Sequence, residues 1–297
     1  MYQQITSNKR KSIILIILFI AILLGLGYFI DYLTDSGNLF FIIAIILSLI
    51  MSLSGYFKGD KIALKLAGAK EIQKEDNPYV WRLIENLCIT AGLAMPKIYL
   101  INDPAPNAFA TGRDPQHASI ALTTGIIKIL ENEELEGVIA HELSHIKNYD
   151  ILIMTLVSVL LGTVVLMSDI FIRSRFWGSS RKSNNKNGGQ LDLILMIIGL
   201  IFVILSPIIA QLIQLAISRK REFLADASGA LLTRYPQGLA NALEKISQYP
   251  QPLQKAKNSM AHFYIINPFG PTKKFMTKLF STHPPVEERI QALKTMA

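Results

Sequence analysis

The sequence predicts a mainly α-helical membrane protein, with four apolar helices and a soluble α+β domain that contains a small β-sheet. Of its 297 residues, 51% are hydrophobic and 18% are charged, and the mean hydropathy is +0.34. Soluble globular proteins carry about 25% charged residues, so this composition excludes a disordered chain and argues against an ordinary soluble protein. The formal charge of +8 accompanies so much apolar sequence that it indicates contact with anionic lipid and not with nucleic acid.

The N-terminal part, residues 1–56, predicts a transmembrane hairpin. Residues 13–30 carry no charge, and a helix of that length spans close to the ~30 Å hydrocarbon layer. A second apolar run, residues 39–56, follows an acidic turn, whereas lysine and arginine flank the outer ends of both runs. The positive-inside rule therefore places the N-terminus and the chain after residue 56 in the cytoplasm. A signal peptide is the alternative reading of the first run, but that run lacks a small-residue cleavage site.

Residues 57–150 have soluble character and form the first part of the predicted soluble domain. The periodicity predicts, in order, a helix over 80–92, a strand over 97–101, a polar loop over 102–115 and a strand over 117–123. A further helix begins near Asn132, which we expect to cap it, with Glu133 and Glu134 in the first turn. Cys88 is the only cysteine of the chain, so it forms no intramolecular disulfide and is expected in the core.

Residues 151–217 predict a second pair of apolar helices, over 151–168 and 193–217, joined by a basic loop at 173–190. This loop lies where simple alternation places the outside of the cell. Either the loop is translocated against its charge, or the pair does not fully cross the membrane. Whether the pair crosses the membrane twice or not at all, the chain after residue 217 lies on the same side of the membrane as the chain before residue 151.

Residues 218–297 therefore share a compartment with residues 57–150 and form the second part of the soluble domain. Helices are predicted over 221–232 and 238–248. The basic and apolar stretch 273–280 is expected to be a surface helix, with contact to the bilayer as the alternative.

The motif His141-Glu142-x-x-His145 carries the clearest chemistry. Apolar residues around it recur at helical spacing, which places it on an amphipathic helix. Side chains four residues apart on a helix differ by about 40° and ~6 Å, so both imidazoles can bind one Zn²⁺. Glu142 is offset from them and can reach a water on the metal, whose pKa zinc lowers toward ~7, and deliver hydroxide to a peptide carbonyl. The motif thus predicts a zinc metalloendopeptidase with one Zn²⁺ per chain.

A third ligand has to come from a remote part of the chain. Asn148 and Ile151 stand where the metzincin extension of the motif would place its glycine and third histidine. Glu222 is the best placed carboxylate, because it follows the second apolar pair by about as many residues as His145 precedes that pair. Asp226 lies four residues further on the same helical face and suits a carboxylate that orients a ligand histidine. The alternative for Glu222 is an ordinary interfacial charge beside Arg219, Lys220 and Arg221.

Four motifs together resemble the HtpX-type membrane zinc metalloproteases, relatives of the CAAX prenyl protease class. They are HELSHIKNYD at 141–150, SRKREFLADASGA at 218–230, PNAFATG at 106–112 and THPPVEERI at 282–290.

The resemblance covers nearly the whole chain and implies Zn²⁺ held by His141, His145 and Glu222, with Glu222 and Asp226 matching the family's Glu-x-x-x-Asp pattern. It implies a zincin-like (gluzincin) catalytic domain that faces the cytoplasm from a multi-pass position in the bacterial inner membrane. The implied substrates are damaged or misfolded membrane proteins or unfolded polypeptides, degraded in quality control and often in a stress response.

Two further matches have weaker roles. Asn107 leads toward the strand over 117–123, which could pair with an extended substrate backbone, and a structural Asx turn is the alternative. His283 and Arg289 have a spacing similar to the family's C-terminal His and Arg, and they could hydrogen-bond the substrate or a developing oxyanion. The alternative for this pair is a helix N-terminus opened by two prolines.

Asp150 fits the family's His-x-x-Asn-x-Asp extension, yet a continuous helix would place it about 140° around from His145, so no metal role is assigned to it. Two rival functions stay open. A CAAX-type prenyl-protein protease is expected to enclose its substrate with more than four membrane helices. A catalytically inert membrane scaffold or transporter would have no need for the intact Glu142 between two histidines.

Overall fold

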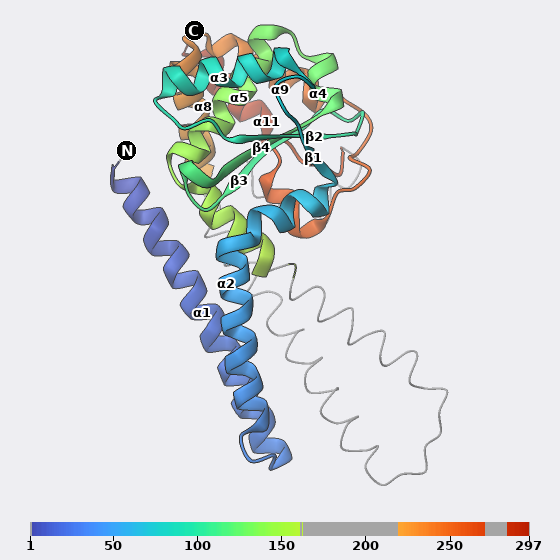
Figure 1. Cartoon of the computed structure of the whole chain (residues 1–297). Helices are drawn as coiled ribbons and strands as arrows, with labels where there is room; N and C mark the ends of the chain where they lie inside the picture. Colours follow the sequence, from blue (N-terminus) through green and yellow to red (C-terminus); the bar gives the residue numbers. More distant parts are fainter. Residues whose placement is uncertain (1, 161, 163–218, 271–283, 297) are drawn as a thin grey trace.

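Two long apolar helices, α1 (Tyr2–Thr34) and α2 (Leu39–Ala67), form a hairpin that projects from the globular part of the chain (Figure 1). The computed structural model describes residues 2–160, 162, 219–270 and 284–296. Within these ranges, α1 and α2 are the two helices long and apolar enough to cross a membrane, and only 6% and 22% of the residues in their most apolar stretches are buried. Such exposed apolar surface suits lipid and not water.

Of the predicted second apolar pair, the structure describes the beginning, which forms the helix Asp150–Leu160. The rest of the pair lies outside the described residues. The basic loop at 173–190, the stretch 273–280 and His283 also lie outside the described residues.

Both helices of the hairpin extend beyond the predicted apolar spans. The first turns of α1 precede the charge-free run, and α2 continues to Ala67, where Gly68 ends it in a left-handed conformation at φ 69°. At the tip of the hairpin, the Asp31 carboxylate accepts hydrogen bonds from the backbone N–H groups of Phe40 (3.1 Å) and Phe41 (2.6 Å). This carboxylate satisfies two of the free donors at the start of α2.

A mixed sheet with the strand order β1–β2–β4–β3 forms the centre of the globular part. The strands are β1 (Ala69–Glu71), β2 (Lys97–Ile101), β3 (Ala108–Gly112) and β4 (Ala118–Thr123). β2 runs parallel to β4, whereas β1 and β3 are antiparallel to their neighbours. The predicted strands over 97–101 and 117–123 are confirmed.

The prediction of a loop over 102–115 is wrong in part, because this stretch contains β3. Three of the five residues in its sequence, Ala-Phe-Ala-Thr-Gly, are alanine or glycine, which are depleted in strands, and proline and asparagine lie close to its ends. The strand exists because Ala108 to Gly112 pair in register with Leu122 to Ala118 of β4. Tertiary pairing thus overrides local propensity here.

The side chains of β3 show how the sheet separates two cores. Ala108 and Ala110 face the core built with the helices α3 (Pro78–Ala91), α5 (Asn132–Lys147) and α9 (Pro236–Ser247). Phe109 between them faces the core built with the end of α2 and the 3-10 helix η2 (Asn258–Phe263). This alternation is the period of two that a strand imposes. The small alanines on the helix side let α5 lie close to the strand.

The helices of the globular part gather mainly on one side of the sheet (Figure 1). They are α3 (Pro78–Ala91), α4 (Thr124–Ile129), α5 (Asn132–Lys147), α8 (Arg219–Thr233), α9 (Pro236–Ser247) and α11 (Val286–Lys294), with short 3-10 helices η1 (Pro115–His117) and η2 (Asn258–Phe263). The predicted helices over 80–92, 221–232 and 238–248 correspond to α3, α8 and α9. Cys88 is buried and free, as expected.

The start of α5 corrects one prediction. Asn132 is the first residue of the helix, and the capping position belongs to Glu131. The Glu134 carboxylate accepts a hydrogen bond from the Glu131 backbone N–H at 2.9 Å, as in a capping box. Several of the polar residues at 131–134 could cap a helix, and the capping residue is Glu131, one position before the predicted Asn132.

Candidate metal centre

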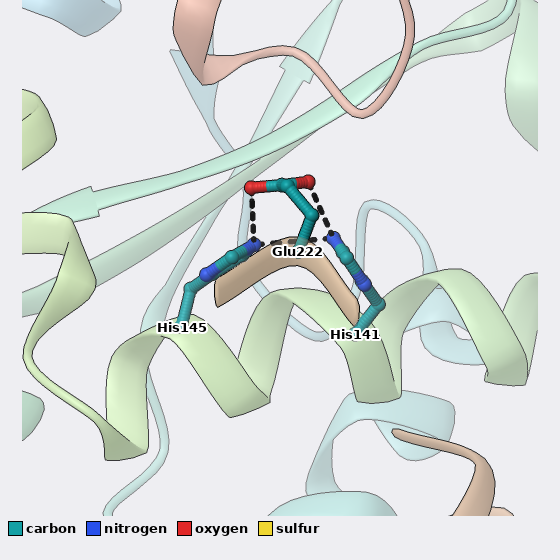
Figure 2. A group of neighbouring side chains, drawn as sticks. All are labelled: His141, His145 and Glu222. Carbon is teal, nitrogen blue, oxygen red and sulfur yellow. Dashed lines mark hydrogen bonds and ion pairs between the residues drawn. The ribbon is translucent and has the colours of Figure 1, made fainter. Parts of the chain in front are cut away.

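Three buried side chains from two helices meet in one group that could hold a metal ion. His141 and His145 come from α5 and Glu222 from α8, and one ligand atom of each lies within 4.8 Å of the others. The two Nε2 atoms are 3.1 Å apart, and the Glu222 carboxylate oxygens lie 3.8 Å from Nε2 of His141 and 3.7 Å from Nε2 of His145. Figure 2 shows both imidazoles rising from α5 toward this carboxylate. Two imidazole nitrogens and one carboxylate are a donor set that Zn²⁺ accepts at catalytic sites.

Close packing of α8 on α5 brings Glu222 to the histidines. At Gly229, a Cβ atom would lie 3.0 Å from the backbone nitrogen of His141, a distance that real side chains rarely tolerate. Glycine at this position therefore permits the two helices to approach. Because Glu222 and Asp226 lie on the same helix, this approach sets the position of both carboxylates.

Each histidine is held from behind by a second carboxylate. The Nδ1 atom of His141 lies 2.9 Å from Oδ1 of Asp226, and Nδ1 of His145 lies 3.0 Å from Oδ2 of Asp150. With Nδ1 engaged in this way, Nε2 of each ring is left to face Glu222. Histidine ligands of metals usually donate their other ring N–H to a carboxylate or carbonyl, so this arrangement fits a metal ion.

The placement of Asp150 corrects the sequence analysis. The projection of about 140° assumed a continuous helix, but α5 ends at Lys147 and Tyr149 has a positive φ of 60°. The chain turns back after the helix, and the Asp150 carboxylate thereby reaches His145. The His-x-x-Asn-x-Asp extension was the sequence signal that pointed to this residue.

Arg289 lies buried beneath the site. Its guanidinium donates from Nε and Nη2 to the two oxygens of Asp226, at 2.8 and 2.6 Å, and from Nη1 to the Ile265 carbonyl at 2.9 Å. Nη1 also lies 3.8 Å from Oε2 of Glu222. Burial alone would raise the pKa of Asp226, but the charge and hydrogen bonds of Arg289 outweigh it and hold that pKa at about 2. Asp226 is thus an anion that can keep its hydrogen bond to His141.

The helix around Arg289 matches the alternative given for it in the sequence analysis. α11 begins at Val286, directly after two prolines, and its first turn carries Glu287 and Glu288. The side chain of Arg289 is 1% exposed and points toward the carboxylates of α8. His283, with which it was paired, lies outside the described residues.

Glu142 lies on α5 between the two histidines in sequence and is also buried. Burial raises its pKa to about 7, and the nearby Glu222 adds to this effect, whereas His145 and a hydrogen bond from the Ala110 backbone N–H oppose it. A carboxyl group that titrates near neutral pH can both accept and release a proton under physiological conditions.

The two histidines have opposite pKa shifts. Burial lowers the pKa of His141 to about 4, despite the opposing effect of Asp226. Burial would also lower the pKa of His145, but the carboxylates of Asp150 and Glu222 outweigh it and raise the pKa to about 9. Without a bound metal, the imidazole of His145 is therefore in its positively charged form at neutral pH. A metal ion that binds the ring has to displace the additional proton.

The expectation that the strand over 117–123 pairs with substrate is wrong. β4 lies between β2 and β3, so both of its edges are already bonded, and β3 is the outer strand next to it. The Asn107 side chain is buried and bonds within its own chain, donating to the Ile266 carbonyl at 3.1 Å and accepting from the Ala108 N–H at 3.0 Å. The missed strand β3 is the reason for this error.

Comparisons with known proteins agree with the site. The profile of peptidase family M48 matches residues 74–297. A protein named Protease HtpX homolog from Tropheryma whipplei (strain Twist) is 46% identical over 296 residues, which cover 100% of this chain and 98% of that protein. Another of that name, from Caldanaerobacter subterraneus subsp. tengcongensis, is 44% identical over 296 residues, with the same coverage.

The crystal structure of S. mikatae Ste24p has a similar fold. It superposes with a TM-score of 0.51 at 21% identity, over 99% of this chain and 67% of that one. The HELSH motif on α5, the carboxylate from α8 and the full-length relatives lead to one assignment. The chain therefore belongs to peptidase family M48, as a membrane metalloprotease of the HtpX type.

Proposed function

We propose that the chain is a zinc metalloendopeptidase in which His141, His145 and Glu222 bind one Zn²⁺ and Glu142 is the general base. The observation that carries this proposal is the buried His/His/Glu group, in which a carboxylate holds Nδ1 of each histidine. When bound, zinc supplies a Lewis acid that polarises the scissile carbonyl and lowers the pKa of water.

The residues of the chain have separate tasks in this proposal. Asp226 and Asp150 fix the ring orientation of His141 and His145, so that each presents Nε2 to the ion. Glu142 accepts a proton from the water that attacks the peptide carbonyl, and it later donates this proton to the departing amine nitrogen. The pKa of about 7 at Glu142 suits a group that performs both transfers.

Substrate has to gain access to a closed site. The three proposed ligands and Glu142 are between 1% and 4% exposed. The outward edge of β3 is also bonded at its start, since the Ala108 carbonyl accepts from the Ile265 N–H at 3.1 Å. We expect the chain around Ile265 to separate from β3 when a peptide binds, and the freed edge can then pair with an extended substrate backbone.

The proposed organisation follows the domain boundaries predicted from the sequence. Residues 1–56 anchor the protein as a transmembrane hairpin, and residues 151–217 form a second membrane-embedded pair with the basic loop at 173–190. Residues 57–150 and 218–297 form the catalytic domain, which faces the cytoplasm from the bacterial inner membrane. The apolar hairpin and its basic flanks support this orientation. Damaged or misfolded membrane proteins are the proposed substrates, because they expose unfolded chain at the level of such a domain.

The proposal is tested by the substitution Glu142→Gln in the full chain, purified in detergent with zinc. Cleavage of an unfolded polypeptide such as casein is expected to fall by about 10²- to 10⁴-fold, the usual contribution of a general base. Zinc content is expected to stay at the wild-type value, since Glu142 is not a proposed ligand. Glu133→Gln on the exposed face of the same helix is the matched control and should cleave like wild type. A Glu142→Gln protein that cleaves at the wild-type rate would refute the mechanism.

A further inference from the structure

The first turns of α1 reach beyond the apolar span and contact the end of the motif helix α5. Asn8, which is 3% exposed, donates both hydrogens of its side-chain amide to this region. One bond goes to the Asn148 carbonyl at 2.9 Å, and the other goes to Oδ1 of Asp150 at 2.7 Å. Because the amide carries two hydrogens and both are used, its orientation is fixed.

Asp150 connects this amide to the metal site. Its second oxygen, Oδ2, lies 3.0 Å from Nδ1 of His145, and the residue is 2% exposed. Arg221 of α8 is a third partner, with Nη1 at 3.4 Å from Oδ1. The carboxylate is therefore held between the proposed zinc ligand and an amide from the membrane hairpin.

A neighbouring contact docks the same turn of α1. The Lys9 ammonium lies 4.3 Å from the centre of the Tyr149 ring, which is a cation–π distance. Residues 8 and 9 of α1 thus contact residues 148–150, the short segment that turns back after α5. This segment joins α5 to the helix Asp150–Leu160, and the Asp150 side chain is held there by Asn8, His145 and Arg221.

We propose that Asn8 is a positioning residue for the metal site, contributed by the N-terminal transmembrane helix. It holds Asp150 in the orientation that directs Nε2 of His145 toward His141 and Glu222. The inference rests on the proposed zinc function, and it adds that the affinity of the site for metal depends on how α1 is docked. The membrane hairpin is then part of the catalytic centre's support as well as an anchor.

A purely structural role for Asn8 makes a different prediction. If its amide only bonded the free carbonyl at the end of α5, its removal would lower the stability of the fold and leave the metal site of the folded protein unchanged. Metal affinity and the visible spectrum of bound Co²⁺ distinguish the two roles, because both report on ligand geometry.

The test uses the full chain in detergent with Asn8→Ala and the isosteric Asn8→Asp. Ser12→Ala is the matched control, since Ser12 is buried on the same helix and, among the described residues, its hydroxyl bonds only the Asn8 carbonyl, at 3.0 Å. Zinc affinity, measured by chelator competition, is expected to fall about three- to tenfold for Asn8→Ala, below the roughly 10- to 100-fold for a direct partner of a ligand. Asn8→Asp should lose more, because it places a second carboxylate beside Asp150. Ser12→Ala should bind zinc like wild type.

A double-mutant cycle tests whether Asn8 affects zinc binding through Asp150. In the background Asp150→Asn, the further change Asn8→Ala should alter zinc affinity by less than it does in wild type, because the effect passes through the carboxylate. Wild-type zinc affinity and an unchanged Co²⁺ spectrum in both Asn8 variants would overturn this inference alone. A wild-type protein that binds neither zinc nor cobalt would overturn the proposed function and this inference with it.

Discussion

Replacing Arg289 with leucine should strongly destabilise the globular part of the chain. The guanidinium is buried, makes two hydrogen bonds to Asp226 at 2.8 and 2.6 Å, and lies 3.8 Å from Glu222. Arg289→Leu leaves the Asp226 carboxylate buried without its main counter-charge. Breaking a buried ion pair by removing one partner costs about 3–5 kcal/mol. For a domain of 150–250 residues this corresponds to a fall in Tm of roughly 6–20 °C.

The assay is thermal unfolding of the full chain in detergent with excess chelator, so that bound metal does not add to the stability. Asp226→Asn in the Arg289→Leu background should recover part of the lost Tm, because the buried charge is then absent. Arg82→Leu removes an exposed arginine from α3 and is the matched control. If Arg289→Leu melts at the temperature of this control, the reasoning about the buried pair is wrong. A double variant that melts below Arg289→Leu would contradict it as well.

Three further outcomes follow from the same geometry. Gly229→Val should push α8 away from His141 and weaken zinc binding, and chelator competition measures this; unchanged affinity would show that the helices tolerate the side chain. Zinc affinity should rise with pH between about 6 and 8, by roughly tenfold per unit, because His145, with a pKa of about 9, has to release a proton first; pH-independent binding would contradict this. Asp226→Asn should lower zinc affinity roughly 10- to 100-fold with the Co²⁺ spectrum altered, and an unaltered spectrum would argue against its role.

The parts of the site that the sequence predicted are those fixed by local periodicity. His141 and His145 are one helical turn apart, so their common face follows from the helix alone. Glu222 could be placed because the predicted helix pair over 151–217 would return the chain to the membrane depth at which it left. Asp226 followed from Glu222 by the same spacing of four residues.

The missed parts depend on where elements end and on distant contacts. Asp150 was misplaced because the projection continued α5 past Lys147, whereas the backbone turns at Tyr149. β3 was missed because alanine and glycine carry little strand preference and its pairing with β4 is a tertiary effect. Asn8 lies about 140 residues from Asp150 in sequence, so no spacing rule connects them.

The burial of the site also depends on contacts of Ile265 that could not be predicted from the sequence. The Ile265 N–H donates to the Ala108 carbonyl, and the Ile265 carbonyl accepts from Arg289, so the residues directly after η2 join the edge strand to the carboxylates behind the site. Such a segment has no periodicity that would reveal its place. Its contacts to Ala108 and Arg289 are distant in sequence, so no local pattern predicts them.

The proposed function depends on a zinc site formed by His141, His145 and Glu222. Zinc content and zinc X-ray absorption of the full-length wild type, beside Glu222→Ala and the exposed control Glu244→Ala, test it most directly. We expect one zinc per chain in wild type and control, with only nitrogen and oxygen ligands at about 2.0–2.2 Å, and loss of zinc in Glu222→Ala. A Glu222→Ala protein that retains one zinc with an unchanged ligand shell would show that the metal is bound elsewhere.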